Sequence, residues 1–309
     1  MTATDLNSRP PQASSGRHSF FAALLAVLGL IVILVLILSG VVYIFGEPKE
    51  KARGTSVGVI EIKGIILRSE PVLRTLVQFR NDKNIKAIIL RVDSGGGGVA
   101  PTQEIYREIM RTRSKKKVIA SLGNLAASGG IYIASAANYI LANPGTLTGS
   151  VSVIMHFTNY EDLFEKVGLK SISITSGEFK DIGSPTRQMT DTEKKILQRL
   201  VDRIHQQFVN DLAKARGIPL EKINALADGQ IFSGEEAVEL GLVDQLGNFE
   251  DAIAYAQKAA GLTARPKLVY PKKKKSWFLD VLTGESQVNL LPDRFSHPVR
   301  LEYLYAPVR

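Results

Sequence analysis

A serine followed by two glycines, Ser128-Gly129-Gly130, stands where a nucleophile could be presented. The apolar run from Val118 to Leu122 predicts a buried strand just before it, and the Ala- and Ile-rich residues after it predict a helix. A serine at such a turn faces unpaired backbone N–H groups, which favour a developing negative charge. The glycines let a substrate approach the backbone closely, as acyl transfer with an oxyanion hole requires. Ser128 could equally be a simple N-cap of the helix.

A serine nucleophile needs a base that takes its proton, and two side chains could serve. Among the four histidines, His156 lies nearest to Ser128 in sequence, but no motif supports a Ser-His-Asp arrangement with it. Lys180 is the competing base. A solvated lysine is neutral in only about one molecule in 2,500 at pH 7, so a lysine acts as a base only where its surroundings lower its pKa by about 2 to 3 units. Without such surroundings, a lysine in a Gly/Ser/Pro-rich loop is a solvated surface charge.

The glycine run Gly95–Gly98 has other interpretations, which the neighbouring residues weaken. A phosphate-binding loop would need Gly-Lys-Ser/Thr after it, and none follows. A dinucleotide-binding fingerprint requires glycines at spaced positions, and a run of four consecutive glycines matches part of it by chance, so the match is not evidence for a dinucleotide site. The chain has no cysteine, so it offers no disulfide, thiolate nucleophile or thiolate metal site. We predict no metal and no organic cofactor.

The elements that must position these groups alternate between strand and helix. Strands are predicted at 57–62, 87–92, 118–122, 139–142 and 171–175, and helices at 71–79, 101–110, after 128, 160–167, 190–216, 233–242 and 252–260. The run at 87–92 is apolar without alternation, as expected of a strand buried on both faces of a parallel sheet. The alternation predicts an α/β architecture.

Residues 20–45 carry no charge and consist mostly of Leu, Ile and Val. About 26 such residues make about 39 Å of helix, against a hydrocarbon core of about 30 Å. The stretch predicts an uncleaved transmembrane anchor, since the apolar region of a signal peptide is shorter. Basic residues flank both ends, so charge does not decide the orientation. The net charge of +9 fits an anionic membrane surface and does not require nucleic acid, which we do not expect as a partner.

The predicted organisation has five parts. A disordered polar tail at 1–19 precedes the anchor at 20–45 and a charged linker at 46–55, and a catalytic domain at 56–270 is followed by a basic tail at 271–309. The run Lys272–Lys275 in that tail is expected to be solvated.

Four motifs in this order carry a resemblance to a known family: Arg91-Val-Asp-Ser-Gly-Gly-Gly-Gly98, Asn124-Leu-Ala-Ala-Ser128-Gly-Gly, Thr148-Gly-Ser150 and Ser176-Gly-x-x-Lys180-Asp-x-Gly-Ser-Pro185. Over about residues 55–260, with an apolar anchor ahead of them, the chain resembles the short, single-repeat form of signal peptide peptidase A. The resemblance implies a serine protease with a Ser-Lys dyad. It also implies the Clp/crotonase-like spiral of ββα units, here preceded by one transmembrane helix.

Roles follow from the resemblance residue by residue. It implies that Ser128 is the nucleophile, that Lys180 is the general base, and that the Ser150 hydroxyl orients the lysine amine. The backbone N–H groups of Gly96 and Gly129 match the oxyanion hole.

The glycine loop departs from the family pattern. Where the family usually has Asn-Ser-Pro-Gly-Gly, this chain has Asp93-Ser94-Gly95-Gly96-Gly97. Because proline fixes φ, its replacement by Gly95 predicts a less constrained loop.

The resemblance further implies substrates, assembly and location. The substrates would be remnant signal peptides and other peptides released from the membrane. The protein would form a ring-like homo-oligomer, an octamer in short forms, with each dyad completed across neighbouring subunits. The catalytic domain would lie outside the cytoplasmic membrane. Two alternatives stay open: a crotonase-type acyl-CoA enzyme on the same fold, and a non-catalytic, membrane-anchored ring that binds partner proteins.

Overall fold

The computed structural model describes residues 16–45, 55–271 and 301–304. The chain divides into two compact units, Met1–Lys51 and Ala52–Arg309, which are described separately. The predicted tail as far as residue 15, the linker at 46–54 and the tetralysine Lys272–Lys275 lie outside the described residues.

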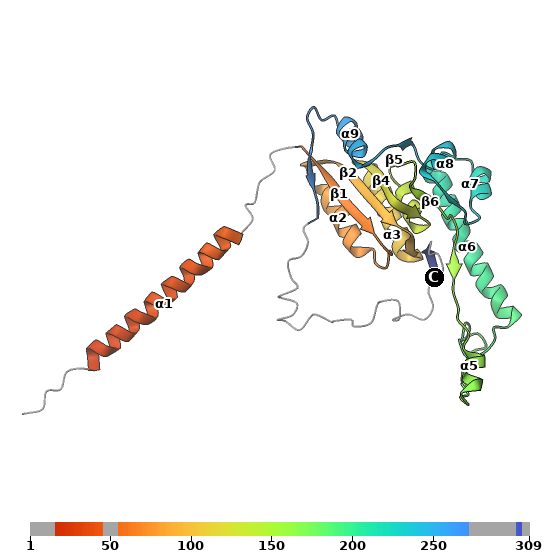
Figure 1. Cartoon of the computed structure of the whole chain (residues 1–309), viewed down its shortest axis with the longest axis horizontal. Coiled ribbons are helices and arrows are strands. Elements are labelled where there is room, and N and C mark those ends of the chain that lie inside the picture. Colours follow the sequence, from red (N-terminus) through yellow and green to blue (C-terminus); the bar gives the residue numbers. More distant parts are fainter. Residues whose placement is uncertain (1–15, 46–54, 272–300, 305–309) are drawn as a thin grey trace, which may run out of the picture. The chain divides into compact units, whose positions relative to one another are not determined.

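The first unit contains one long helix, α1 (Gly16–Phe45), shown in Figure 1. Its segment Ala22–Gly40 is long and apolar enough to cross a membrane, and no other described helix meets this criterion. Length and composition fit a membrane span and a signal sequence alike. The helix begins before the predicted start at residue 20, since each residue added to a nucleated helix gains a hydrogen bond.

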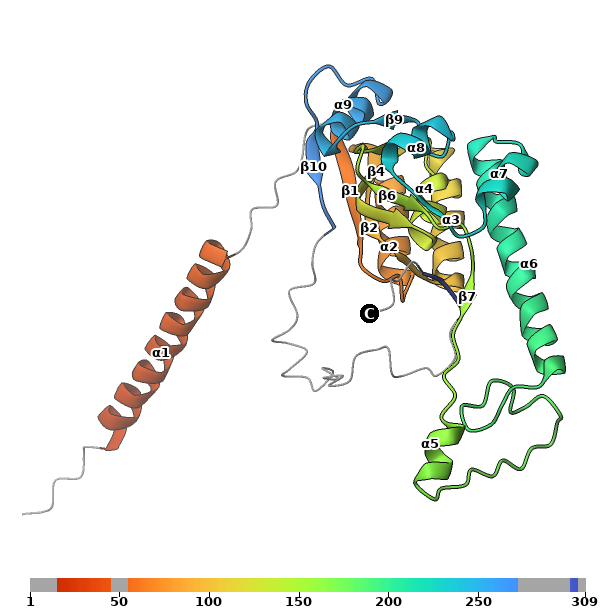
Figure 2. The same cartoon turned by 45° about the vertical axis from the view of Figure 1, so that its right-hand side comes forward.

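The second unit is built on an eight-stranded sheet (Figures 1 and 2). Its main path runs β10-β1-β2-β4-β5-β9, while β6 pairs with β4 and β8 pairs with β6. All of these pairs are parallel except β6 with β8. The bounds are β1 (Ser56–Lys63), β2 (Ile85–Ser94), β4 (Lys117–Ala127), β5 (Tyr139–Ala142), β6 (Leu147–Gly149), β8 (Ile231–Phe232), β9 (Gln245–Leu246) and β10 (Lys267–Val269). The predicted α/β class is confirmed.

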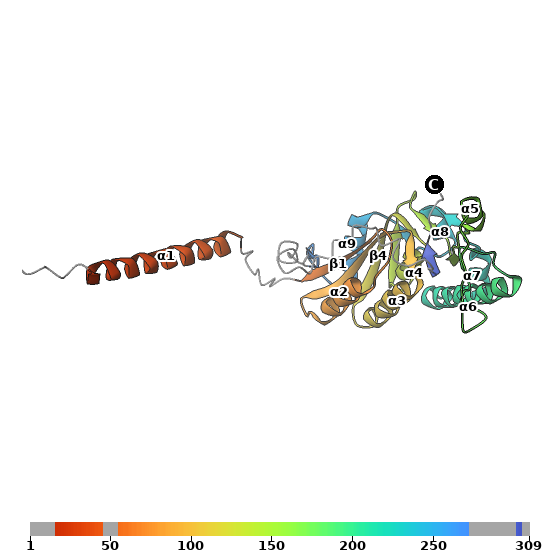
Figure 3. The same ribbon diagram turned by 90° about the horizontal axis from the view of Figure 1, so that it is seen from below.

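Helices cover both faces of this sheet, as Figure 3 shows from below. One face carries α2 (Glu70–Asn81), α3 (Val99–Arg113) and α4 (Gly129–Ser135), and the other carries α9 (Phe249–Ala259). In β2, Ile88 and Leu90 join the core on the first face, and Ala87 and Ile89 join the core on the second. Burial on both faces explains why this strand is apolar without alternation. The other helices in the described part of this unit are α5 (Glu161–Lys166), α6 (Asp191–Arg216), α7 (Leu220–Leu226) and α8 (Gly234–Glu239).

A second, three-stranded sheet has the order β3-β11-β7. It consists of β3 (Gly96–Gly98), β11 (Leu301–Leu304) and β7 (Ile154–Met155), and both pairings are antiparallel. The glycine run therefore forms a strand, and the segment predicted as a basic tail supplies the middle strand.

Between β7 and α6 the chain leaves the sheet as a segment that we call the arm, residues 156–189 (Figures 1 and 2). It contains α5, but the strand predicted at 171–175 is wrong, because these residues have no regular structure. Ile172 is 84% exposed and Ile174 is 97% exposed. A strand needs a neighbour for its hydrogen bonds, and the described part of the protomer offers none here.

Candidate active site

Ser128 lies between the last residue of β4 and the first residue of α4. Its φ is 53° and its ψ is −116°, a conformation that residues with a Cβ rarely adopt. Among the described residues, only Ser128 and Ser150 combine a positive φ with a side chain. Ser128 occupies the N-cap position of α4, but its side chain makes no capping hydrogen bond, so capping does not explain the presence of a serine here. Strained conformations of this kind concentrate at functional sites.

The strain predicts different stabilities for two variants of Ser128. Ser128→Gly removes the Cβ that disfavours this backbone, whereas Ser128→Ala retains it. We expect the glycine variant to be more stable than the alanine variant by about 1 to 2 kcal/mol, measured by chemical denaturation. The usual entropic cost of glycine acts in the other direction. An alanine variant of equal or higher stability would contradict the proposed strain.

Ser150 stands beside Ser128 because of the strand pairing. In the parallel ladder of β4 and β6, Ala127 pairs with Gly149, so the two serines follow paired residues. The Ser128 N–H donates to the Gly149 carbonyl at 2.8 Å. The Ser150 N–H donates in turn to the Gln230 carbonyl at 2.6 Å. Both serines are buried, and the structure brings these two predicted site residues together.

Gly96 and Gly129 approach each other at the same place. A Cβ built on Gly96, whose φ is 97°, would lie 2.6 Å from the Gly129 amide nitrogen, so no larger residue fits. The Gly96 N–H donates to Ser94 Oγ at 3.1 Å. The Gly96 carbonyl accepts from the Ile66 N–H at 2.9 Å. These bonds hold the loop that lacks the family's proline at Gly95.

Lys180 is not brought to Ser128 within the protomer. It lies on the arm, which is directed away from β4 and α4 in both views (Figures 1 and 2). Its side chain is exposed. Within the described chain, its amine makes no hydrogen bond or ion pair. His156 is also exposed, directly after β7. No group of three or more His, Cys, Asp or Glu side chains among the described residues could hold a metal ion.

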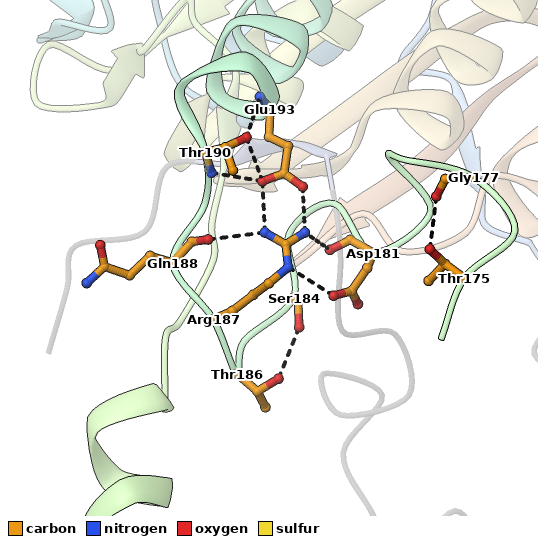
Figure 4. Close-up of polar contacts among 9 residues, drawn as sticks. All are labelled: Thr175, Gly177, Asp181, Ser184, Thr186, Arg187, Gln188, Thr190 and Glu193. Atoms are coloured by element: carbon orange, nitrogen blue, oxygen red, sulfur yellow. Dashed lines mark hydrogen bonds and ion pairs between the residues drawn. The ribbon is translucent and has the colours of Figure 1, made fainter. Parts of the chain in front are cut away.

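Arg187 fixes the residue that follows Lys180, a role that sequence reasoning missed (Figure 4). Its Nε donates to Asp181 Oδ2 at 3.0 Å, and its Nη2 donates to the Asp181 carbonyl at 2.9 Å. Both Nη groups also donate to the Glu193 carboxylate, at 2.5 and 2.9 Å. Glu193 belongs to the capping box with Thr190 that begins α6. The loop that carries Lys180 is therefore tied to the first turn of a long helix. The separation of Arg187 and Glu193 by six residues gives no familiar motif.

This contact predicts a pH dependence of stability. The Arg187 guanidinium, followed by the Thr190 backbone, lowers the pKa of Glu193 from 4.5 to about 2. A carboxyl whose pKa is depressed on folding contributes stability above its unfolded pKa, and this contribution is lost as the pH falls through the folded pKa. The parent should therefore exceed Glu193→Gln in free energy of unfolding above pH 4.5, and the difference should shrink towards pH 2. Glu221→Gln, at an exposed glutamate on α7, serves as the control, and an equal pH dependence in both variants would contradict the assignment.

β11 was also missed from the sequence, although it borders the site. Its residues pair with the glycine strand β3, and Tyr303 is fully buried. The run Leu301-Glu-Tyr-Leu-Tyr305 contains two tyrosines, which favour strands, a signal that could have found it.

Comparisons with known proteins identify the family of the chain. Peptidase family S49 matches residues 110–263. The Synechocystis protein named "Putative protease slr0021" is 40% identical over 249 residues, covering 80% of this chain and 90% of that protein. The Enterococcus faecium protein named "Putative signal peptide peptidase SppA" is 37% identical over 199 residues, 64% of this chain and 58% of that protein. Protease 4 of Salmonella typhi is 33% identical over 258 residues, 80% of this chain and 40% of that protein. The chain thus belongs to peptidase family S49 and is a protease of the signal peptide peptidase A type.

Proposed function

We propose that this protease is a membrane-anchored serine endopeptidase that uses a Ser-Lys dyad. The observation that carries the proposal is the strained backbone of Ser128. Its side chain makes no capping hydrogen bond, and the residue lies beside Ser150 and beside the close approach of Gly96 and Gly129. A nucleophile held in this way needs no rearrangement to meet a carbonyl carbon.

The reaction follows from the roles of these groups. The Ser128 hydroxyl attacks a peptide carbonyl, and neutral Lys180 accepts its proton and passes it to the leaving amine. The Ser150 hydroxyl orients the lysine amine. The Gly129 N–H stabilises the oxyanion, and the Gly96 N–H joins it by exchanging its bond to Ser94 for one to the substrate.

Lys180 comes from a neighbouring protomer in this proposal. The exposed arm supports it, because a protomer alone leaves much apolar surface bare on this segment. The exposed apolar side chains of the arm are Tyr160, Leu163, Val167, Leu169, Ile172, Ile174 and Phe179. A neighbour that covers this surface would bring the arm's lysine to a second protomer's serine. A closed ring gives every protomer the same pair of contacts, which fits the ring-like homo-oligomer of the family.

The apolar helix α1 would anchor this ring to the cytoplasmic membrane, with the catalytic domain on the outer side. Remnant signal peptides and other peptides released from the bilayer are then the nearest substrates. The parallel, helix-covered sheet is compatible with the spiral fold of the Clp and crotonase proteins, which we assign by family resemblance.

Hydrolysis of a signal peptide by the full chain in detergent micelles tests the proposal. The parent should cleave the peptide, and Ser128→Ala should lose at least about a thousandfold in kcat/KM. Ser114→Ala, at an exposed serine after α3, provides a matched serine control. Cleavage that survives Ser128→Ala would exclude Ser128 as the nucleophile.

A further inference from the structure

Thr102 carries a buried hydroxyl to which the proposed reaction gives no role. The residue lies in the first turn of α3, which packs beside α4 (Figures 2 and 3). It is fully buried, and its Oγ1 has no hydrogen-bond partner within the described residues. A buried hydroxyl without a partner lowers the stability of a protein, so a specific use for it is expected.

Two other buried threonines show what a helical hydroxyl ordinarily does. Thr75 and Thr112 each donate to the backbone carbonyl four residues earlier, at 2.9 and 2.8 Å. Threonine hydroxyls in helices often bond in this way. Thr102 makes no such bond, although it belongs to the same helix as Thr112. Its hydroxyl is therefore available to a partner outside its own helix.

The Thr102 hydroxyl lies where the two glycines of the site approach each other. A Cβ built on Gly129 would lie 3.0 Å from Thr102 Oγ1 and 2.9 Å from Gly96 Cα. The hydroxyl and the glycine strand thus flank one side of the residue that follows Ser128. Because Gly129 has no Cβ, no side-chain atom of its own separates the hydroxyl from this junction.

The donors of the proposed oxyanion hole are only partly free. The Gly96 N–H donates to Ser94 Oγ at 3.1 Å, and Ser94 Oγ donates in turn to the Gly64 carbonyl at 2.5 Å. Use of the Gly96 N–H therefore requires that one of these connected bonds breaks. The Thr102 hydroxyl has no bond to lose. A donor that is unpaired in the free enzyme gains a complete hydrogen bond when negative charge develops, and such a gain accelerates the reaction.

We propose that Thr102 is a further catalytic residue, whose hydroxyl donates a hydrogen bond to the oxyanion that forms when Ser128 attacks. It acts beside the N–H groups of Gly129 and Gly96. The inference rests on the proposed function and adds a side-chain donor to it. The hydroxyl keeps its proton throughout the reaction and gains only a hydrogen-bond acceptor. The stability that the unpaired hydroxyl costs the free protein is recovered as binding of the transition state.

Thr102→Val tests this role, because valine has a similar branched shape but no hydroxyl. With the full chain in detergent and a signal peptide as substrate, we expect kcat to fall about a hundredfold and KM to change less than about threefold. Thr102→Ser keeps the hydroxyl and should retain kcat within about fivefold. An unchanged kcat in Thr102→Val would overturn the proposal. An equal loss in both variants would also overturn it, since the methyl group would then be the group that matters.

Thermal unfolding separates a catalytic hydroxyl from a structural one. Thr102→Val replaces an unpaired buried hydroxyl with a methyl group, so its unfolding midpoint should equal or exceed that of the parent. Thr112→Val, equally buried in the same helix, is the matched control. It removes a hydroxyl that is bonded to the Glu108 carbonyl, so it should lower the midpoint and leave kcat near that of the parent. If Thr102→Val lowers the midpoint as much as Thr112→Val does, its hydroxyl supports the fold and the proposal fails.

A peptide aldehyde measures binding of the oxyanion directly. Ser128 Oγ bonds reversibly to the aldehyde carbon, and the serine proton passes to Lys180 of a neighbouring protomer, which leaves the aldehyde oxygen negatively charged. We expect the inhibition constant to rise about a hundredfold in Thr102→Val, in parallel with the loss in kcat. In Thr102→Ser it should stay within about fivefold of the parent value. An inhibition constant that does not change in Thr102→Val would contradict a bond to the oxyanion.

The outcomes distinguish this inference from the proposed function. If Ser128→Ala abolishes cleavage while Thr102→Val keeps the parent kcat, the serine protease stands and the role of Thr102 is wrong. If cleavage survives Ser128→Ala, the proposed function fails and the inference fails with it.

Discussion

Lys180→Met should reduce peptide hydrolysis by about a thousandfold, as loss of a general base does. Methionine is a similar unbranched side chain that lacks the terminal amine, so it cannot accept the serine proton. Lys170→Met, at an exposed lysine on the same arm, is the matched control and should retain turnover. Initial rates on one signal peptide measure both variants. If Lys180→Met retains the parent rate, the base lies elsewhere, and His156, exposed after β7, becomes the next residue to test.

Co-expression of two inactive variants tests where the lysine comes from. Within one protomer, Ser128→Ala lacks the nucleophile and Lys180→Met lacks the base, so a dyad formed inside the protomer stays inactive. In a mixed ring, half of the serines and half of the neighbouring lysines are intact, so about a quarter of the sites recover. Co-expression of Ser128→Ala with the double variant Ser128→Ala/Lys180→Met is the control and should recover nothing. Absence of recovery in assembled mixed rings would contradict a dyad shared between protomers.

Local signals predicted the elements whose structure is set locally. Thr190 and Glu193 form a capping box, and Gly217 has a φ of 65° at the other end, so both ends of α6 could be read from the sequence. The turn at Ser128 was likewise visible as a strand followed by Ser-Gly-Gly. Its backbone strain, a φ of 53°, was not visible in the residue pattern.

Non-local pairing explains what the sequence did not reveal. The strand predicted at 118–122 continues to Ala127 because Leu125 to Ala127 pair with β6. β11 owes its place to β3 and β7, which lie far from it in sequence. The strand predicted at 171–175 has suitable side chains but no partner in the described protomer. In each case the residue pattern is compatible with a strand, and whether a strand forms depends on a neighbouring strand that can pair with it.

The exposed isoleucines of the segment 171–175 give the second prediction with a large expected effect, which concerns the assembly of protomers. Ile172→Asp combined with Ile174→Asp should dissociate the proposed ring into protomers and abolish peptide hydrolysis. Each isoleucine contributes about 1.5 to 3 kcal/mol when it becomes buried, and an unpaired carboxylate in its place costs more. The loss should weaken association by at least about a hundredfold.

The fold of the protomer should survive this double substitution, because both side chains are almost fully exposed in it. Light scattering in detergent measures the assembly, and the thermal unfolding midpoint measures the fold. Leu220→Asp, at a 41% exposed leucine on α7 outside the arm, is the control and should leave mass and turnover unchanged. A double variant that remains assembled and active would show that the arm does not form the subunit contact. One that dissociates yet still cleaves peptides would place the base within the protomer, since an isolated chain has no neighbour to supply Lys180.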